Sequence, residues 1–187
     1  LLVVALPAAY VLSRFQFKGR KFLNVCFMGG LFINVNYIVV PIFLMLRDGD
    51  LWLKNLVGGS FLLNNIFVLA VVYAATALPF TIYLLSGYFA TLPHDYEEAA
   101  YIDGCTHTQT FFRIVFPLLK PIISTMVIMN AMAFWNDFLL PSLVLTDKKL
   151  LTLPLSTYSF YGTYSADYGT IMAGLLLCVI PILILYV

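Results

Sequence analysis

The fold is decided by the stretch Glu98-Ala99-Ala100-Tyr101-Ile102-Asp103-Gly104, which runs on to Ile114-Val115-Phe116-Pro117. It is the long polar interruption in a chain that otherwise consists of apolar segments. Residues 92–117 hold four of the nine acidic residues and both histidines. Because polar groups are costly inside hydrocarbon, we expect this stretch to lie outside a bilayer and to contact another molecule there.

The first half of this stretch predicts a short helix that ends at Gly104. Thr91 fits a cap, and Pro93 suits a first helical turn, where a missing N–H costs nothing. Acidic residues follow in the first turns, where the helix dipole favours anions: Asp95, Glu97 and Glu98. Gly104 fits the left-handed position that ends many helices, because glycine has no Cβ to clash there.

The second half predicts another helix that starts at once. Thr106-His107-Thr108-Gln109 fits a capping box, in which threonine and glutamine side chains satisfy the first backbone N–H groups. Aromatic and aliphatic side chains then recur at helical spacing, and Pro117 and Pro121 mark the transition to the next apolar segment. From these residues alone, an amphipathic hairpin that only reconnects two spans remains an equal alternative.

Composition places the rest of the chain in a membrane. The 187 residues are 62% hydrophobic and 10% charged, whereas soluble domains are about 45–50% apolar and about 25% charged. The net charge of +1 gives no reason to expect a nucleic-acid partner. The three cysteines are scattered without metal-ligand spacing, so neither a disulfide framework nor a metal site is predicted.

We therefore predict an all-α, polytopic transmembrane bundle that occupies residues 1–187 as a single domain. The predicted spans are residues 1–12, 22–46, 61–90, 118–145 and 169–187, of which the first and last are partial. Pro41 and Pro79 are expected to kink their spans. Because the chain begins without Met inside an apolar run, we expect it to be a fragment with sequence missing at both ends.

Charge sets the predicted orientation. Arg14, Lys18, Arg20 and Lys21 form a short basic loop without an acidic residue, which by the positive-inside rule lies in the cytoplasm. Counting spans from there, residues 91–117 are also cytoplasmic, and residues 47–60 and 146–168 form outer loops.

Two further groups of residues are candidates for function. Asp137 is a carboxylate inside a predicted span, and with Trp135 and Asn136 it either lines a substrate pathway or packs and pairs between helices. The outer loop carries residues that suit contact with a protein or a sugar, although interfacial aromatic residues explain them equally well. They are Tyr158, Tyr161, Tyr164 and Asp167.

The central stretch resembles the EAA loop of ABC importer permeases. That pattern is Glu-Ala-Ala, three residues, Gly, nine residues, Ile, one residue, Leu and Pro. Glu98, Ala99, Ala100, Gly104, Ile114 and Pro117 match it, and Phe116 stands in place of Leu.

The flanking motifs resemble the MalG-like permeases of oligosaccharide importers along essentially the whole chain. They are Phe15–Lys21, Leu78-Pro79-Phe80, Trp135-Asn136-Asp137-Phe138 and Thr152-Leu153-Pro154. The outer loop at residues 47–60 is longer than usual for this family. The resemblance implies the type I ABC importer permease fold in a bacterial cell membrane, with the first span missing upstream.

The resemblance also implies partners and roles. The helix that contains Glu98 docks on a cytosolic ABC ATPase dimer, with Glu98 as a charged contact, Ala99 and Ala100 as a close-approach surface and Gly104 as the turn; Asp103 belongs to the same stretch. A second permease subunit and an extracytoplasmic sugar-binding protein complete the importer, and the permease pair forms the pathway for the sugar.

The residues themselves are compatible with the resemblance to ABC importer permeases. The chain has no phosphate-binding Gly-x-x-x-x-Gly-Lys-Ser/Thr loop, so ATP and its hydrolysis belong to a partner, and we predict no cofactor and no enzyme activity in this chain. The alternative is an ion-gradient-driven transporter or channel. That class needs ionisable residues at mid-depth, where only Asp137 is a candidate. A membrane-embedded enzyme would need a His/Asp/Glu or Ser/His cluster that no span supplies.

Overall fold

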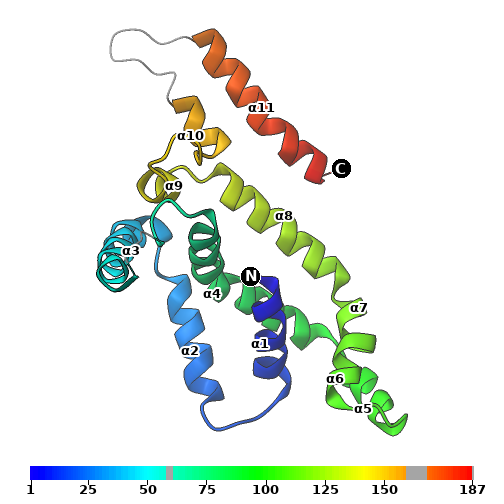
Figure 1. The fold of residues 1–187 in the computed structure, drawn as a ribbon. Helices are drawn as coiled ribbons and strands as arrows, with labels where there is room; N and C mark the ends of the chain where they lie inside the picture. The colour runs from blue at the N-terminus through cyan, green and yellow to red at the C-terminus, as the bar shows by residue number, and fades with distance from the viewer. Residues whose placement is uncertain (58–60, 159–167, 187) are drawn as a thin grey trace. The chain divides into compact units, whose positions relative to one another are not determined.

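The computed structural model describes residues 1–57, 61–158 and 168–186, and all regular structure in these ranges is helical (Figure 1). The helices in chain order are α1 (Leu2–Arg14), α2 (Arg20–Leu31), α3 (Val35–Val57), α4 (Ile66–Thr91), α5 (Asp95–Ile102), α6 (His107–Thr110), the π-helix η1 (Phe111–Val115), α7 (Phe116–Leu118), α8 (Lys120–Asn136), α9 (Leu139–Val144), α10 (Leu153–Tyr158) and α11 (Tyr168–Tyr186).

The chain divides into two compact units. Unit 1 comprises Leu1–Phe32 and Ala77–Met129, and unit 2 comprises the described residues of Ile33–Thr76 and Asn130–Val187. The long helices α4 and α8 each contribute one part to each unit.

Unit 1 is built on α1, the second part of α4 and the segment from α5 to α8. Its buried core is apolar, with Leu85, Phe89, Leu119 and Met126 almost fully enclosed. The helices α2 and α4 approach closely at Gly30, where a Cβ would lie 2.9 Å from the Cγ of Pro79. Glycine at this position allows the close backbone approach that helix packing in membranes favours.

Unit 2 has its own core between α3, the first part of α4, and α9. Val39, Leu69, Leu140 and Val144 are buried there. The short α10 packs along α11, and a Cβ on Gly174 would lie 2.6 Å from the Cγ2 of Thr157.

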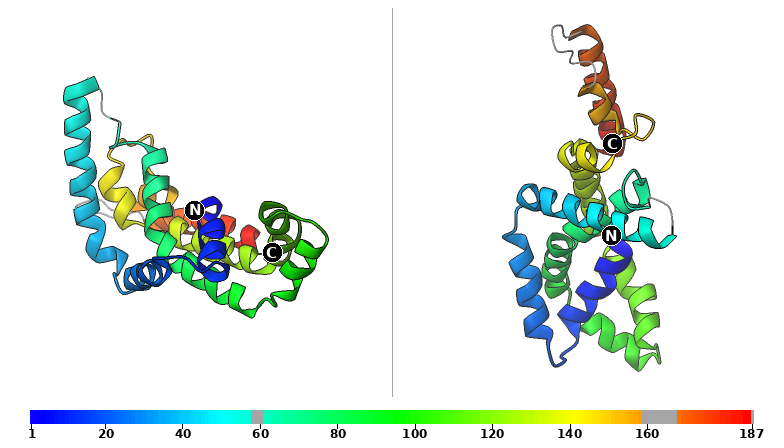
Figure 2. Two further views of the ribbon diagram at one scale, coloured as in Figure 1. Left: turned by 90° about the horizontal axis from the view of Figure 1, so that it is seen from below. Right: turned by 60° about the vertical axis from the view of Figure 1, so that its left-hand side comes forward.

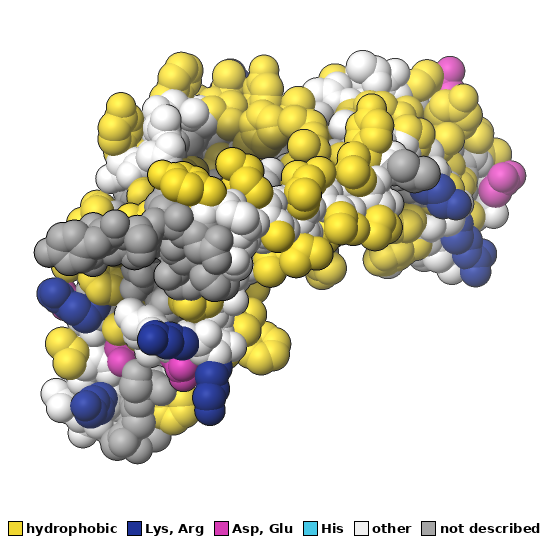
Figure 3. Space-filling view, turned by 90° about the horizontal axis from the view of Figure 1, so that it is seen from above, with side chains coloured by type: hydrophobic (Ala, Val, Ile, Leu, Met, Phe, Trp, Pro, Cys, Tyr) yellow, Lys and Arg dark blue, Asp and Glu magenta, His cyan; other side chains and the backbone are white. Residues whose placement is uncertain are grey.

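Two helices of the described residues are long and apolar enough to cross a membrane, namely Ile66–Thr91 and Tyr168–Tyr186. Two interrupted pairs qualify if each pair is one span: α2 with α3, and the α6–α7 segment with α8. Hydrophobic side chains are spread over much of the face shown in Figure 3. This exposed apolar surface agrees with a lipid or protein environment around the helices.

The predicted span at residues 22–46 is not one continuous helix. The helix α2 ends at Leu31, after two glycines of low helix propensity, and α3 begins at Val35. Asn34 caps the new helix, because its Oδ1 accepts the N–H of Asn36 at 3.0 Å. The structure also extends α3 to Val57, so most of the predicted outer loop at residues 47–60 is helical.

The predicted span at residues 118–145 is likewise interrupted. At its start, the segment His107–Leu118 meets α8 at a bend of 70°, which agrees with the transition predicted at Pro117 and Pro121. A proline at residue 121 has no N–H to continue the helical hydrogen bonds, which explains the bend. A second interruption separates α8, which ends at Asn136, from α9.

Candidate functional site

The helix α5 ends as its sequence predicts. Gly104 adopts a φ of +81°, and the N–H of Cys105 donates to the carbonyl of Ala100 at 2.9 Å. The N–H of Gly104 donates to the carbonyl of Tyr101 at 3.0 Å. These two bonds form a Schellman motif, which fixes the direction of the chain as it leaves α5.

The helix α6 starts with the predicted capping box. The N–H of Gln109 donates to the Oγ1 of Thr106 at 3.4 Å, and the N–H of Thr106 donates to the Oε1 of Gln109 at 2.9 Å. The chain then widens into the π-helix η1, which buries Phe111 and Val115 in the core of unit 1 and leaves Phe112 exposed. Figure 1 shows α5, α6 and α7 grouped together, and the same green segment is grouped in both views of Figure 2.

The start of α5 differs from the prediction. Thr91 is the last residue of α4, where its hydroxyl donates to the carbonyl of Tyr88 at 2.7 Å, so it is not a cap for α5. Pro93 lies in the turn before the helix, and α5 begins at Asp95 after His94. The long apolar helix α4 therefore continues one residue into the segment assigned to the loop.

The motif residues on α5 divide between its two faces. Glu98 and Ala99 are exposed, and Ile102, one turn further on, is 86% exposed. Ala100 is 1% exposed and packs inward within this chain. We call Glu98, Ala99 and Ile102 the outer face of α5. This face therefore presents a charged and an apolar side chain together.

The remaining motif residues lie around this helix. Asp103 and Pro117 are exposed, and Ile114 of η1 is half-buried. Asp103 is the C-cap residue of α5. The structure therefore brings Asp103 next to the outer face, while Ile114 and Pro117 lie on the second half of the segment.

Sequence reasoning missed an ion pair that fastens this segment to α1. The Nε of Arg14 lies 2.8 Å from the Oε1 of Glu97, and both side chains are buried. The same guanidinium lies 2.9 Å from the Nε2 of His94 and donates to the carbonyl of Leu92 at 2.8 Å. Only the local charges of Arg14 and Glu97 were visible in the sequence, because the two residues are far apart along the chain.

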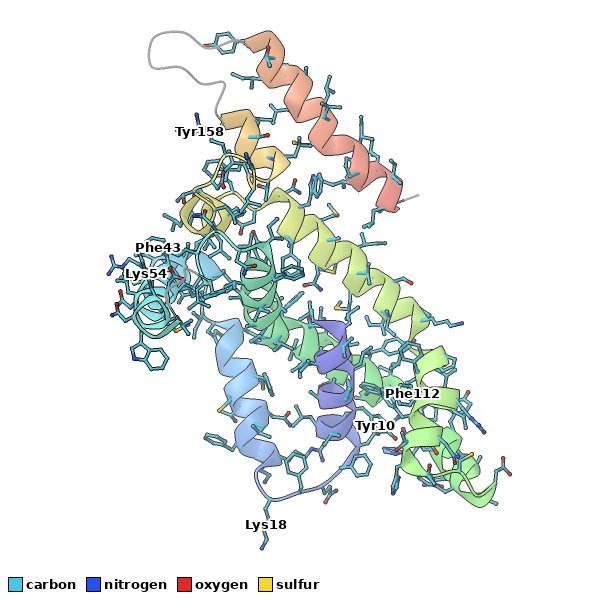
Figure 4. All side chains as sticks on the ribbon, in the orientation of Figure 1. Tyr10, Lys18, Phe43, Lys54, Phe112 and Tyr158 are labelled. Carbon is cyan, nitrogen blue, oxygen red and sulfur yellow. The ribbon has the colours of Figure 1, made fainter. Side chains whose placement is uncertain are left out.

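Aromatic contacts extend this attachment. The rings of Tyr10 on α1 and Phe111 on η1 have centroids 4.9 Å apart, and Tyr10 also contacts Phe89 at 5.6 Å. The rings of Phe15 and His107 meet edge to face at 5.6 Å. Figure 4 shows Tyr10 on α1 beside the segment that carries Phe112. Both halves of the polar segment therefore rest on the end of α1.

In unit 2, Asp137 holds the interruption between α8 and α9. Its Oδ2 accepts the hydroxyl of Tyr73 at 2.8 Å, and its Oδ1 accepts the N–H of Leu139 at 3.1 Å. The indole N–H of Trp135 donates to the carbonyl of Cys178 at 2.9 Å, while Asn136 is exposed. The contacts of Asp137 and Trp135 follow the structural alternative, pairing and packing between helices.

The predicted outer site is described only in part. Tyr158 is exposed, and its ring contacts Phe138 with centroids 5.3 Å apart. Tyr161, Tyr164 and Asp167 lie outside the described residues. Within residues 1–57, 61–158 and 168–186, no group of three or more His, Cys, Asp or Glu side chains is placed to hold a metal ion.

Comparisons with known proteins agree with this architecture. The model of the family described as binding-protein-dependent transport system inner membrane component matches residues 2–187. The chain is 37% identical over 190 residues to the diacetylchitobiose uptake system permease protein NgcG of Streptomyces coelicolor, covering 100% of the chain and 59% of NgcG. It is 37% identical over 184 residues to the multiple sugar-binding transport system permease protein MsmG of Streptococcus mutans, covering 96% of the chain and 62% of MsmG.

A solved structure shares the fold. The match is to a chain of a bacterial ABC transporter involved in the import of the acidic polysaccharide alginate, with a TM-score of 0.80 and 23% identity. It covers 99% of the present chain and 66% of that chain. The chain thus spans less than two thirds of the length of these relatives, and the predicted all-α permease fold is confirmed.

Proposed function

Because the chain belongs to the family of binding-protein-dependent transport system inner membrane components, we propose that it acts as a permease subunit of an ATP-driven ABC importer. In this role it forms half of the translocation pathway for a sugar. Family membership also makes it a multi-pass component of the bacterial inner membrane, and the subunits of this family leave ATP hydrolysis to a separate ATPase.

The observation that carries the proposal is the outer face of α5. Its residues are held outward on a helix whose end is fixed by the Schellman motif at Gly104 and whose start is fastened by Arg14. A surface of this kind suits a rigid docking element. The cytosolic ATPase dimer receives Glu98, Ala99 and Ile102, and closure of the dimer around ATP moves α5.

The proposed topology places residues 91–117 in the cytoplasm as the coupling segment. Its support is the attachment to Arg14, which brings the segment to the same end of unit 1 as the basic loop. The spans remain those predicted, adjusted for the interruptions at Phe32–Asn34 and after Asn136.

The proposed cargo is an oligosaccharide delivered by an extracytoplasmic binding protein. The names of NgcG and MsmG support a sugar, since they concern diacetylchitobiose and multiple sugars. A second permease subunit completes the pathway, with Trp135, Asn136 and Asp137 as residues of this chain near it. Tyr158, Tyr161, Tyr164 and Asp167 are proposed to meet the binding protein.

Reconstitution tests the proposal. The full-length permease, its partner permease, ATPase and binding protein are placed in liposomes, and uptake of radiolabelled maltose, cellobiose, arabinobiose and diacetylchitobiose is measured. We expect uptake of at least one sugar only when ATP is present on the side of the membrane that holds the ATPase and when the binding protein is present. Uptake driven by a proton or sodium gradient without ATP would favour the transporter alternative and overturn the proposal.

A further inference from the structure

We infer that Arg14 is the positioning residue through which movement of α5 reaches the apolar helix α1. The inference rests on the proposed function, because it assumes that a partner moves α5. It concerns how movement of α5 is transmitted to other helices of this chain.

The guanidinium of Arg14 engages three groups around the start of α5. It contacts the Oε1 of Glu97 at 2.8 Å, the Nε2 of His94 at 2.9 Å and the carbonyl of Leu92 at 2.8 Å. A planar guanidinium with several fixed N–H groups can make such contacts at once, whereas an ammonium acts as a single point charge. The start of α5 is therefore fixed in position and in orientation relative to Arg14.

This ion pair is shielded from solvent. The side chains of Arg14 and Glu97 are 6% and 8% exposed. Water and salt screen a buried pair less than a surface pair, and loss of one partner leaves an uncompensated buried charge. The pair consequently resists separation when α5 is pushed, unlike the exposed pair of Arg47 and Asp48.

The α1 side of the contact is equally fixed. Arg14 is the last residue of α1. The guanidinium of Arg20 donates to the carbonyls of the two residues before Arg14, Leu12 at 2.7 Å and Ser13 at 3.0 Å. Cations at the end of a helix are also favoured by its dipole. Arg20 is in turn the first residue of α2, so force that arrives at Arg14 passes to both α1 and α2.

On α5, the residues that receive and transmit force lie on different faces. Glu97 and Ala100 are buried, whereas Glu98, Ala99 and Ile102 are exposed. A partner that pushes the outer face therefore presses Glu97 toward Arg14 across the width of a single helix. Tyr10 and Phe15 add contacts to the second half of the segment, but Arg14 is the charged contact to α5 itself.

The experiment separates transmission of movement from simple stability. In the reconstituted full-length importer, the ratio of sugar molecules taken up to ATP molecules hydrolysed is measured for Arg14→Met, Arg14→Lys and Glu97→Gln. The matched control is Lys18→Met, which removes a positive charge from the same basic loop; Figure 4 shows Lys18 pointing away from the helices. Uptake uses whichever of the four radiolabelled disaccharides the unaltered importer transports.

We expect Arg14→Met to lower the ratio of uptake to ATP hydrolysis about tenfold, the size of effect seen when a coupling network is altered. Arg14→Lys keeps the charge but not the three contacts, so it should fall between Arg14→Met and the unaltered protein. Lys18→Met should keep the ratio. A merely structural role would reduce the amount of assembled complex and leave the ratio per complex unchanged.

Each outcome decides the matter. An unchanged ratio in Arg14→Met and Glu97→Gln, with the unaltered importer active, would overturn the inference alone. If Arg14→Met fails to assemble, Glu97→Gln and Arg14→Lys decide it by the same ratio. Absence of ATP-dependent uptake of all four sugars by the unaltered importer would instead overturn the proposed function, and the inference with it.

Discussion

Two polar segments flank α4 in the chain, and they use their polar groups in opposite ways. Before α4, the Oδ1 of Asp50 accepts the N–H groups of Phe61 at 2.8 Å and Leu62 at 2.7 Å. Asn64, with a φ of 55°, accepts the N–H groups of Thr146 and Asp147 at 2.7 and 3.0 Å. Both side chains bind backbone groups of connections in unit 2, and we call Asp50 with residues 61–65 the self-contained segment.

The segment after α4, residues 92–117, instead keeps a charged and apolar face outward, and we call it the outward-facing segment. Glu98 and Ile102 are exposed, and the groups that stabilise the segment, such as Arg14 and Glu97, lie behind it. The difference shows that a polar interruption alone does not identify a binding site. The segment before α4 uses these polar side chains for contacts within unit 2, whereas the segment after α4 leaves Glu98 and Ile102 exposed and available to a partner.

The largest effect is expected at Gly104 of the outward-facing segment. Gly104→Val places a β-branched side chain at a φ of +81°, a conformation that costs an ordinary residue about 1–2 kcal/mol and a β-branched one more. We expect sugar uptake to fall by about tenfold or more while the complex still inserts. Gly104→Asn is the matched control, because asparagine tolerates this conformation; equal loss in both variants would contradict the account.

A smaller effect, and one on stability alone, is expected at Asp50 of the self-contained segment. Asp50→Ala removes an acceptor for two backbone N–H groups and should lower the free energy of unfolding by about 1–3 kcal/mol. Thermal unfolding of the purified permease measures this. Asp48→Ala, which removes a largely exposed ion pair with Arg47, should change stability by less than about 1 kcal/mol. A drop in sugar uptake per ATP in Asp50→Ala would contradict the assignment of Asp50 to stability alone.

The smallest effect on the fold is expected at Ile102. Because its side chain is 86% exposed, Ile102→Ser should leave thermal unfolding unchanged. Loss of a buried apolar contact with the ATPase should weaken its binding to the permease about tenfold. Binding of the purified ATPase to the permease in nanodiscs checks this, with Phe61→Ser, also exposed but in the self-contained segment, as the control. Equal weakening by both substitutions would contradict the assignment.

Features that depend on neighbouring residues could be predicted from the sequence. The left-handed turn at Gly104 and the capping box at Thr106 follow from residues within a few positions of each other. The break between α2 and α3 was missed, because an uncharged run of 25 residues gives the same hydropathy signal whether or not Asn34 caps a new helix.

Contacts between distant residues could not be predicted. Nothing near Arg14 in the chain indicates Glu97, and the burial of Ala100 depends on which face of α5 meets unit 1. The hydrogen bond of Asp137 could not be predicted for the same reason, since its partner Tyr73 belongs to another helix. The motif therefore located the exposed polar segment, while three-dimensional packing determined which of its residues face outward.

Site-specific crosslinking tests the central claim most directly. The native cysteines Cys26, Cys105 and Cys178 are replaced by serine, and a single cysteine is introduced at Ile102 or, as the control, at Phe61. With a short bifunctional thiol reagent, and with single cysteines in the ATPase, the account predicts a permease–ATPase product from Ile102→Cys and none from Phe61→Cys. Absence of the product from Ile102→Cys in an assembled complex, or equal yield from both positions, would contradict docking of the ATPase on the outer face of α5.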